Sequence, residues 1–140
     1  MKKLLLVILA VVAVISAGSF AFAQSSPQVK VTAYYFHGSF RCITCTNMEK
    51  YSREAIEASF KDALASGKLE FKAVNVEDRG NEHFVNDYKL YTKSLILSLV
   101  KDGKEVKSKN LDQIWQLARN KQKFIEYVTT EVGALMKDAQ

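Results

Sequence analysis

The feature that most constrains the fold is a Cys-x-x-Cys motif placed where a buried strand meets a long helix. The strand is predicted over Val29–His37, where β-branched and aromatic residues first alternate with polar ones and then become continuously apolar. Good helix formers occupy about 44–66, and Gly67 follows in the position typical of a helix end. Cys42 and Cys45 therefore lie at the start of the predicted first helix.

The remaining elements alternate in a regular order. Further strands are predicted over 69–76, 94–100 and 104–108, and further helices over 82–88 and 112–136. Asp102-Gly103 between the last two strands is a strong hairpin signal. The order β-α-β-α-β-β-α predicts an α/β fold, a three-layer α/β/α sandwich with a mixed four-stranded sheet. Right-handed crossovers would make the first three strands parallel, with an antiparallel fourth and helices on both faces.

The first residues are typical of a secretory signal peptide. Lys2 and Lys3 precede an apolar run over 4–15, and small residues then lead to an Ala-x-Ala triplet that ends at Ala23. We expect cleavage after Ala23, export to the periplasm or another extracytoplasmic space, and a single domain over 24–140. The alternative is a retained membrane anchor over 4–23, because ~20 residues can just cross a bilayer.

The charge pattern argues against a nucleic-acid partner. The chain has 20 Lys and Arg against 15 Asp and Glu, and the two lysines at the start belong to the predicted signal peptide. The remaining charges are interleaved rather than gathered into the basic stripe that nucleic-acid binding favours. We expect an ordinary solvated surface.

The position of the two cysteines indicates their chemistry. A helix N-terminus carries unpaired N–H groups and a partial positive charge, so a thiolate there has a pKa below the reference of ~8.5. Cys42 would be the exposed nucleophile, and Cys45, one turn further on, would resolve the mixed disulfide. A structural disulfide across so short a loop would add only ~2 kcal/mol or less. We therefore predict a catalytic, redox-active Cys42–Cys45 disulfide and no other cofactor.

Two alternatives remain open for this motif. One is an inert local disulfide, and the other is a metal site. Cys42, Cys45 and His37 supply three ligands, whereas a zinc site needs four, and two thiolates alone can hold Cu(I). The chain has two histidines and no second cysteine pair.

Three neighbours are candidates for tuning the thiolate. Arg41 either adds a favourable charge or is a solvated loop residue. His37 is either a proton shuttle or ligand, or a partly buried residue at the end of the strand. Thr44 either donates a hydrogen bond to a thiolate or caps the helix. Four nearby aromatic residues are expected in the core: Tyr34, Tyr35, Phe36 and Trp115.

The order of elements, with Tyr35-Phe36-His37 leading to Cys42-Ile-Thr-Cys45 and a long helix, resembles the thioredoxin superfamily over essentially the whole of 24–140. A closer resemblance is to the small exported bacterial family of ArsF-type subunits of nitrophenyl-compound nitroreductase. It is carried by four motifs: Tyr-Tyr-Phe-His-x3-Arg-Cys-x-Thr-Cys, Asn81-x-His83-Phe84, Tyr88-x-Leu-x-Thr-Lys-Ser94 and Asn110-Leu-x-x-Ile-Trp115. The family name implies an electron-transfer role.

The chain departs from the thioredoxin pattern at two places. Thioredoxins usually have Trp directly before the first cysteine, where this chain has Arg41. They also place a cis-proline at the start of the third strand, where Lys93 and Ser94 stand here. A cis peptide bond without proline costs ~3 kcal/mol, so we expect a trans bond. The surface that receives a partner beside the dithiol should therefore differ from that of a thioredoxin.

Together these features predict an enzyme, an exported thiol–disulfide oxidoreductase or electron-transfer protein. Its partner would be a protein thiol or disulfide, or a membrane electron donor. The alternative is a metal-binding protein, with Cu(I) or Zn, or a non-catalytic accessory subunit built on the same fold. The direction of electron flow does not follow from the sequence, because it depends on the electrostatics around the sulfurs.

Overall fold

The computed structural model describes residues 28–139 of the 140-residue chain. The predicted signal peptide and its cleavage point lie outside the described residues. Between residues 28 and 139, no helix combines the length and the apolar character needed to cross a membrane.

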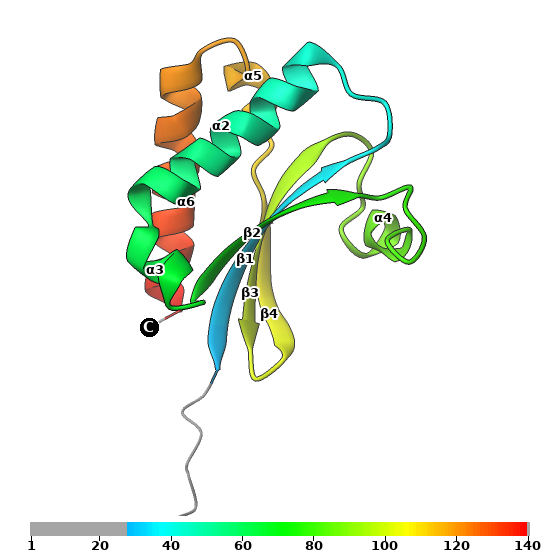
Figure 1. Ribbon diagram of the computed structural model, residues 1–140. Coiled ribbons are helices and arrows are strands. Elements are labelled where there is room, and N and C mark those ends of the chain that lie inside the picture. The colour runs from blue at the N-terminus through cyan, green and yellow to red at the C-terminus, as the bar shows by residue number, and fades with distance from the viewer. Residues whose placement is uncertain (1–27, 140) are drawn as a thin grey trace, which may run out of the picture.

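A mixed four-stranded sheet forms the middle of the molecule (Figure 1). Its strands are β1 (Val29–His37), β2 (Leu69–Asn75), β3 (Ser94–Lys101) and β4 (Lys104–Asn110). They lie in the order β2-β1-β3-β4. The expected α/β class with a mixed four-stranded sheet is confirmed, and β1 has the predicted bounds.

The predicted direction of β3 is wrong. β1 pairs in parallel with β2 but antiparallel with β3, and β3 pairs antiparallel with β4. The connection between β2 and β3 contains only the five-residue helix α4 (His83–Asp87). Such a helix spans about 7 Å, whereas a seven-residue strand spans about 23 Å. The connection therefore holds no helix long enough to run back along the sheet, and β3 starts at the end where β2 stops and runs antiparallel to it.

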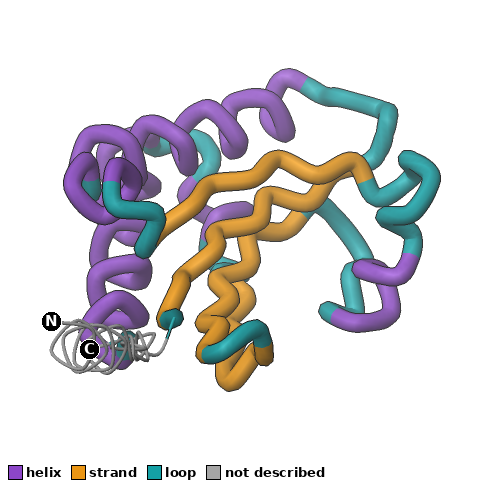
Figure 2. Tube along the Cα trace, turned by 60° about the horizontal axis from the view of Figure 1, so that its bottom comes forward, coloured by secondary structure: helices purple, strands orange, loops and turns teal. Residues whose placement is uncertain are grey.

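Helices cover both faces of the sheet, as predicted. The other helices are α2 (Ile43–Ser59), α3 (Lys61–Ala65), α5 (Ile114–Leu117) and α6 (Lys121–Asp138). The long helices α2 and α6 pack against each other on one face, and α4 lies on the opposite face (Figures 1 and 2). Tyr51 of α2 meets Phe124 of α6 edge to face, with ring centroids 5.7 Å apart.

Both long helices predicted from the sequence are divided. The first ends at Ser59 because Phe60 leaves the helical conformation (φ −130°, ψ 38°), and α3 then begins. The last is divided between α5 and α6, because Asn120 adopts an extended conformation and caps α6 by accepting a hydrogen bond from the Lys123 amide. Asparagine is a preferred residue for this cap.

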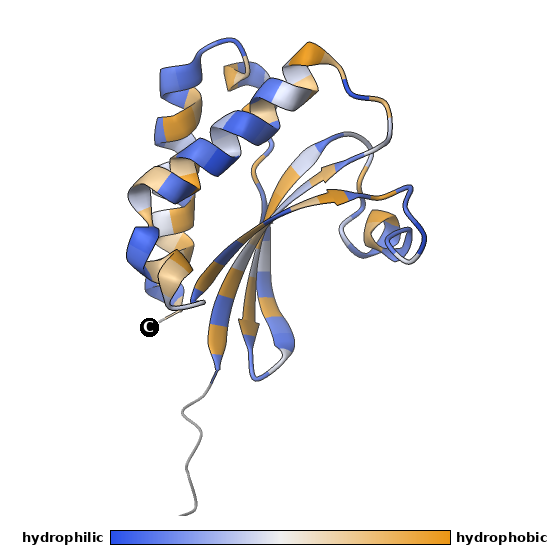
Figure 3. Cartoon of the chain, in the orientation of Figure 1, coloured by the Kyte–Doolittle hydropathy of each residue, from blue (hydrophilic) through white to orange (hydrophobic). Residues whose placement is uncertain are grey.

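Alternation along β1 separates two apolar layers. Figure 3 shows the alternating hydropathy of the strands. The side chains of Val31, Ala33 and Tyr35 are buried in the core shared with α2 and α6. The alternate residues Tyr34 and Phe36 face α4, where their rings meet those of two α4-region residues, Phe84 and Tyr88.

A carboxylate fastens the α4 region to the sheet. The Tyr88 hydroxyl donates a hydrogen bond to Glu105 Oε2 of β4 at 2.5 Å, and the buried Ser98 hydroxyl of β3 donates to the same oxygen. Burial, and then the hydrogen bond to Glu105, raises the pKa of Tyr88. The phenol therefore stays protonated and keeps donating.

Candidate functional site: a disulfide at the start of α2

Cys42 and Cys45 are joined in a disulfide, with an S–S distance of 2.13 Å and Cα atoms 5.1 Å apart. The two residues differ sharply in exposure. Cys42 is partly exposed, whereas only 2% of Cys45 is accessible. A reagent or partner approaching from solvent can therefore reach Cys42 and not Cys45. This asymmetry fits the predicted division into an attacking and a resolving cysteine.

The start of α2 is built around the Cys42 sulfur. Cys42 is the N-cap residue, in an extended conformation (φ −85°, ψ 160°). Its Sγ accepts a hydrogen bond from the Cys45 amide at 3.1 Å, and its carbonyl accepts from the Thr46 amide at 2.9 Å. An amide aimed at the sulfur and the positive end of the helix both favour a thiolate over a thiol. The predicted location at a helix N-terminus is confirmed.

Thr44 does not cap the helix, because the Cys42 sulfur does. Thr44 is exposed between the cysteines. The threonine that takes part in the first turn is Thr46, whose hydroxyl donates to the Cys42 carbonyl at 3.2 Å.

Arg41 is paired with a carboxylate. Its guanidinium forms a salt bridge with Glu49 of α2, and Glu49 also lies 3.6 Å from Arg53. The positive charge next to Cys42 is therefore partly balanced by Glu49. The sequence reasoning missed Glu49, because Arg41 precedes the helix and the pair does not follow the usual helical spacing.

Tyr35 lies beneath the dithiol turn. Its side chain is fully buried, and its hydroxyl donates to the Cys45 carbonyl at 2.7 Å. Burial raises the pKa of Tyr35, while Arg41 lowers it and Glu49 raises it to smaller extents. The phenol therefore remains protonated and holds the carbonyl of the buried cysteine. Its predicted place in the core is confirmed, and the contact with Cys45 is a new finding.

His37 ends β1 and is partly buried. Its Nδ1 lies 2.9 Å from the Gly38 carbonyl oxygen. A carbonyl only accepts, so this hydrogen bond places the proton on Nδ1. Within residues 28–139, no group of three or more His, Cys, Asp or Glu side chains is arranged to hold a metal ion. The structure therefore does not gather Cys42, Cys45 and His37 into the alternative three-ligand site.

A polar network from the end of β2 holds the loop before Cys42. Glu77 Oε2 accepts from the Ser39 amide at 3.1 Å, and Asn75 Nδ2 donates to the Ser39 hydroxyl at 3.2 Å. The Glu77 carboxylate also lies against Gly38, where a Cβ atom would collide with it. Hydrogen bonds from Ser39, followed by smaller effects of Lys93 and His37, lower the pKa of Glu77. An ionised Glu77 thus anchors the dithiol loop at neutral pH.

The loop over 92–94, which the resemblance to thioredoxins places where they have a cis-proline, lies beside the dithiol loop. Lys93 Nζ is 5.9 Å from the centroid of the Phe40 ring, and the Trp115 indole donates to the Lys93 carbonyl at 3.0 Å. The buried Ser94 hydroxyl donates to the Thr92 carbonyl at 3.0 Å. No peptide bond between residues 28 and 139 is cis, as expected for this loop. Trp115 is 40% exposed, so the prediction that it lies in the core is wrong.

Large apolar side chains are exposed to solvent in and near the motif and in the loop that leads into β3. Phe40 is 76% exposed and Ile43, between the cysteines, is 83% exposed. Tyr91, two residues before Lys93, is 95% exposed. The sequence carried a signal for the first two, because Phe40 lies two residues before Cys42 and Ile43 directly after it. Exposed apolar clusters of this kind commonly mark interaction sites.

No family model and no curated protein matches the chain. Among solved structures, the chain is similar to the thioredoxin of Fasciola hepatica, with 24% sequence identity and a TM-score of 0.40. That comparison covers 72% of this chain and 80% of the thioredoxin.

Proposed function

We propose that this protein is a thiol–disulfide oxidoreductase that uses Cys42 and Cys45. The observation that carries the proposal is a disulfide at a helix start, with one sulfur partly exposed and the other buried. An inert disulfide can cap a helix through such an amide, but it does not need a sulfur that solvent or a partner can reach. A nucleophile does need one, and the same amide stabilises its thiolate.

The reaction is a pair of exchange steps. In the reduced protein, the Cys42 thiolate attacks a disulfide sulfur of the partner, and the partner's other sulfur leaves as a thiolate that takes up a proton. Cys45 then loses its proton to solvent and attacks Cys42 Sγ, which releases the partner's second thiolate and forms the Cys42–Cys45 disulfide. Two electrons pass from the protein dithiol to the partner's disulfide. The reverse steps oxidise a partner dithiol.

The surroundings of the dithiol support this role. The helix start and the Cys45 amide are the main stabilisers of the thiolate, because the charge of Arg41 is shared with Glu49. Cys45 is held in place by the Tyr35 hydroxyl. Exposed Phe40 and Ile43 offer apolar contact to a partner that approaches Cys42.

The partner and the location belong to the same proposal. We place the protein outside the cytoplasm, exported by the predicted signal peptide with cleavage after Ala23. The partner is a protein thiol or disulfide, or a membrane electron donor. The resemblance to ArsF-type nitroreductase subunits favours an electron-transfer role for the dithiol.

The test is the reduction of insulin disulfides by the reduced protein, with Cys42→Ser and Cys45→Ser as matched variants. We expect Cys42→Ser to lose the activity. Cys45→Ser should instead accumulate a mixed disulfide through Cys42, visible as a mass increase that dithiothreitol removes. Equal activity in the wild type and Cys42→Ser would remove Cys42 from the mechanism and refute the proposal.

A second measurement gives the direction of electron flow. The reduction potential of the Cys42–Cys45 couple can be measured against glutathione buffers. A value near −120 mV is typical of a strong oxidant, and one near −270 mV of a reductant.

A further inference from the structure

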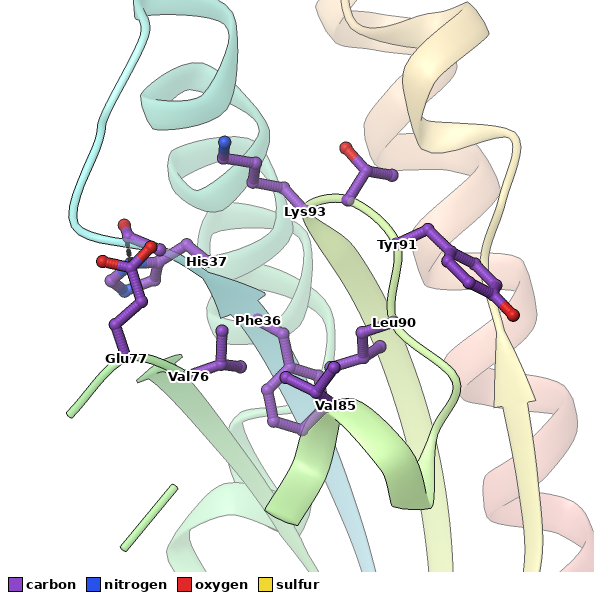
Figure 4. A pocket seen from close by; sticks show the side chains of 10 residues that line it. Phe36, His37, Val76, Glu77, Val85, Leu90, Tyr91 and Lys93 are labelled. Atoms are coloured by element: carbon purple, nitrogen blue, oxygen red, sulfur yellow. Dashed lines mark hydrogen bonds between the residues drawn. The ribbon is translucent and has the colours of Figure 1, made fainter. Parts of the chain in front are cut away.

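A pocket opens at the same end of the sheet as the dithiol, on the face covered by α4 (Figure 4). Its volume is about 170 Å³. It lies between the ends of β1 and β2, the α4 region and the loop that leads into β3. Its floor consists of four apolar side chains: Phe36, Val76, Val85 and Leu90.

The rim of the pocket is polar. His37 and Glu77 lie on one side and Lys93 on another, while the Tyr91 ring points away from the cavity (Figure 4). The Glu77 carboxylate and the Lys93 ammonium carry opposite charges, and Lys93 is close enough to lower the pKa of Glu77. The two charges balance each other, so the rim offers no net charge for a charged ligand to pair with.

The pocket adjoins the approach to Cys42. Lys93, on its rim, reaches over the exposed ring of Phe40. Phe40 stands two residues before Cys42, and the loop between β1 and α2 is fixed to the rim through the bond from the Ser39 amide to Glu77. A polypeptide lying across Phe40 therefore passes the mouth of the pocket.

We propose that this pocket receives an apolar side chain, of the size of Leu or Phe, from the partner segment that carries the reacting cysteine. The proposal rests on the proposed thiol–disulfide exchange and adds a substrate preference to it. A cavity of roughly 150 Å³ with apolar walls is large enough to hold benzene, so this volume suits one such side chain. The apolar floor and the balanced rim select a neutral occupant over a charged one.

The test uses short peptides with a single cysteine joined to thionitrobenzoate. Attack of the Cys42 thiolate on the peptide sulfur forms the mixed disulfide and releases the coloured thionitrobenzoate anion. In one peptide series, Leu is placed in turn at each of the two positions before and the two positions after the cysteine. The matched series has Ala at the same positions. Ellman's reagent, which carries no peptide, reports the reactivity of Cys42 itself.

In the wild type we expect Leu at one position to raise the rate constant about tenfold over Ala, which corresponds to partial burial of the side chain. Val85→Phe should fill the pocket and reduce this Leu/Ala ratio to below about twofold. Val106→Phe makes the same change at an exposed site on β4, outside the pocket, and should keep the ratio. Leu90→Ala should enlarge the pocket and shift the preference from Leu toward Trp.

Three results would overturn the inference. The first is equal rates for Leu and Ala peptides at every position in the wild type. This result needs no variant, so it counts even if Val85→Phe does not fold. The second is a Leu/Ala ratio that does not change in Val85→Phe, which would show that the Leu side chain binds elsewhere on the surface. If Ellman's reagent itself released no thionitrobenzoate, the proposed function would fail along with the pocket. A normal reaction with no peptide preference would refute the pocket alone.

Discussion

Replacing Tyr35 with Phe should weaken the support beneath the dithiol turn by a measurable amount. The substitution removes a buried hydroxyl that donates to the Cys45 carbonyl at 2.7 Å and leaves the ring in place. A hydrogen bond of this kind contributes about 1 kcal/mol net to stability. Unfolding of residues 28–139, at roughly 2.1 cal/mol/K per residue, carries an entropy of about 0.24 kcal/mol/K. The expected fall in Tm is therefore about 4 °C.

Thermal unfolding of the oxidised protein, followed by circular dichroism, measures this fall. Tyr34→Phe is the matched control, because it is the same change one residue away, on the face where Tyr34 stacks on Phe36. We expect the control to shift Tm by less than about 2 °C, as for most substitutions away from buried interactions. Equal shifts in the two variants would show that the Tyr35 hydroxyl does not support the Cys45 turn.

Three further predictions concern other parts of the molecule. The pKa of Glu77 is lowered in the folded state. Its anchoring of the dithiol loop should therefore be complete above the unfolded pKa of ~4.3 and be lost as the pH falls through the folded value. The NMR chemical shift of the Ser39 amide should follow this titration in the wild type and should not change with acid in Glu77→Gln. Asn120→Ala removes the cap of α6 and should cost about 1 kcal/mol, or about 4 °C in Tm, while Asn120→Gly should cost only a few tenths of a kcal/mol. Since burial and Glu105 raise the pKa of Tyr88, its phenol should titrate in the ultraviolet at a higher pH than free tyrosine, and Glu105→Gln should lower the pKa of Tyr88. A phenolate that forms at the ordinary pH of tyrosine would contradict the hydrogen bond between Tyr88 and Glu105.

The sequence was sufficient where the determinants are local. The bounds of β1 and the position of Cys42 at a helix start follow from side-chain pattern and spacing within a dozen residues. The direction of β3 did not follow, because it depends on the path of the chain between β2 and β3, where the only helix has five residues. The right-handed crossover rule holds for connections that return along the sheet, and this connection does not return.

The candidate site shows the same difference between features with local determinants and features that depend on tertiary structure. The spacing of the two cysteines and their place between a strand and a helix predicted the disulfide pair, whereas the exposed apolar residues beside them were not singled out. The pairing of Arg41 with Glu49 and the contact of Trp115 with the Lys93 carbonyl depend on tertiary structure. Trp115 was expected in the core as part of the apolar face of the last helix, but its indole N–H donates to the Lys93 carbonyl and the ring is 40% exposed.

The edge strand β4 affects whether two copies of the protein can associate through their sheets. All of its residues are exposed, and it carries three lysines, Lys104, Lys107 and Lys109. An unpaired strand edge invites the same edge of a neighbouring molecule, and lysines oppose such pairing because two copies would bring like charges together. The last two lysines are held on the α6 side by Asp138 and Glu131. At this edge, the charged side chains disfavour pairing of β4 with β4 of a second copy of the protein.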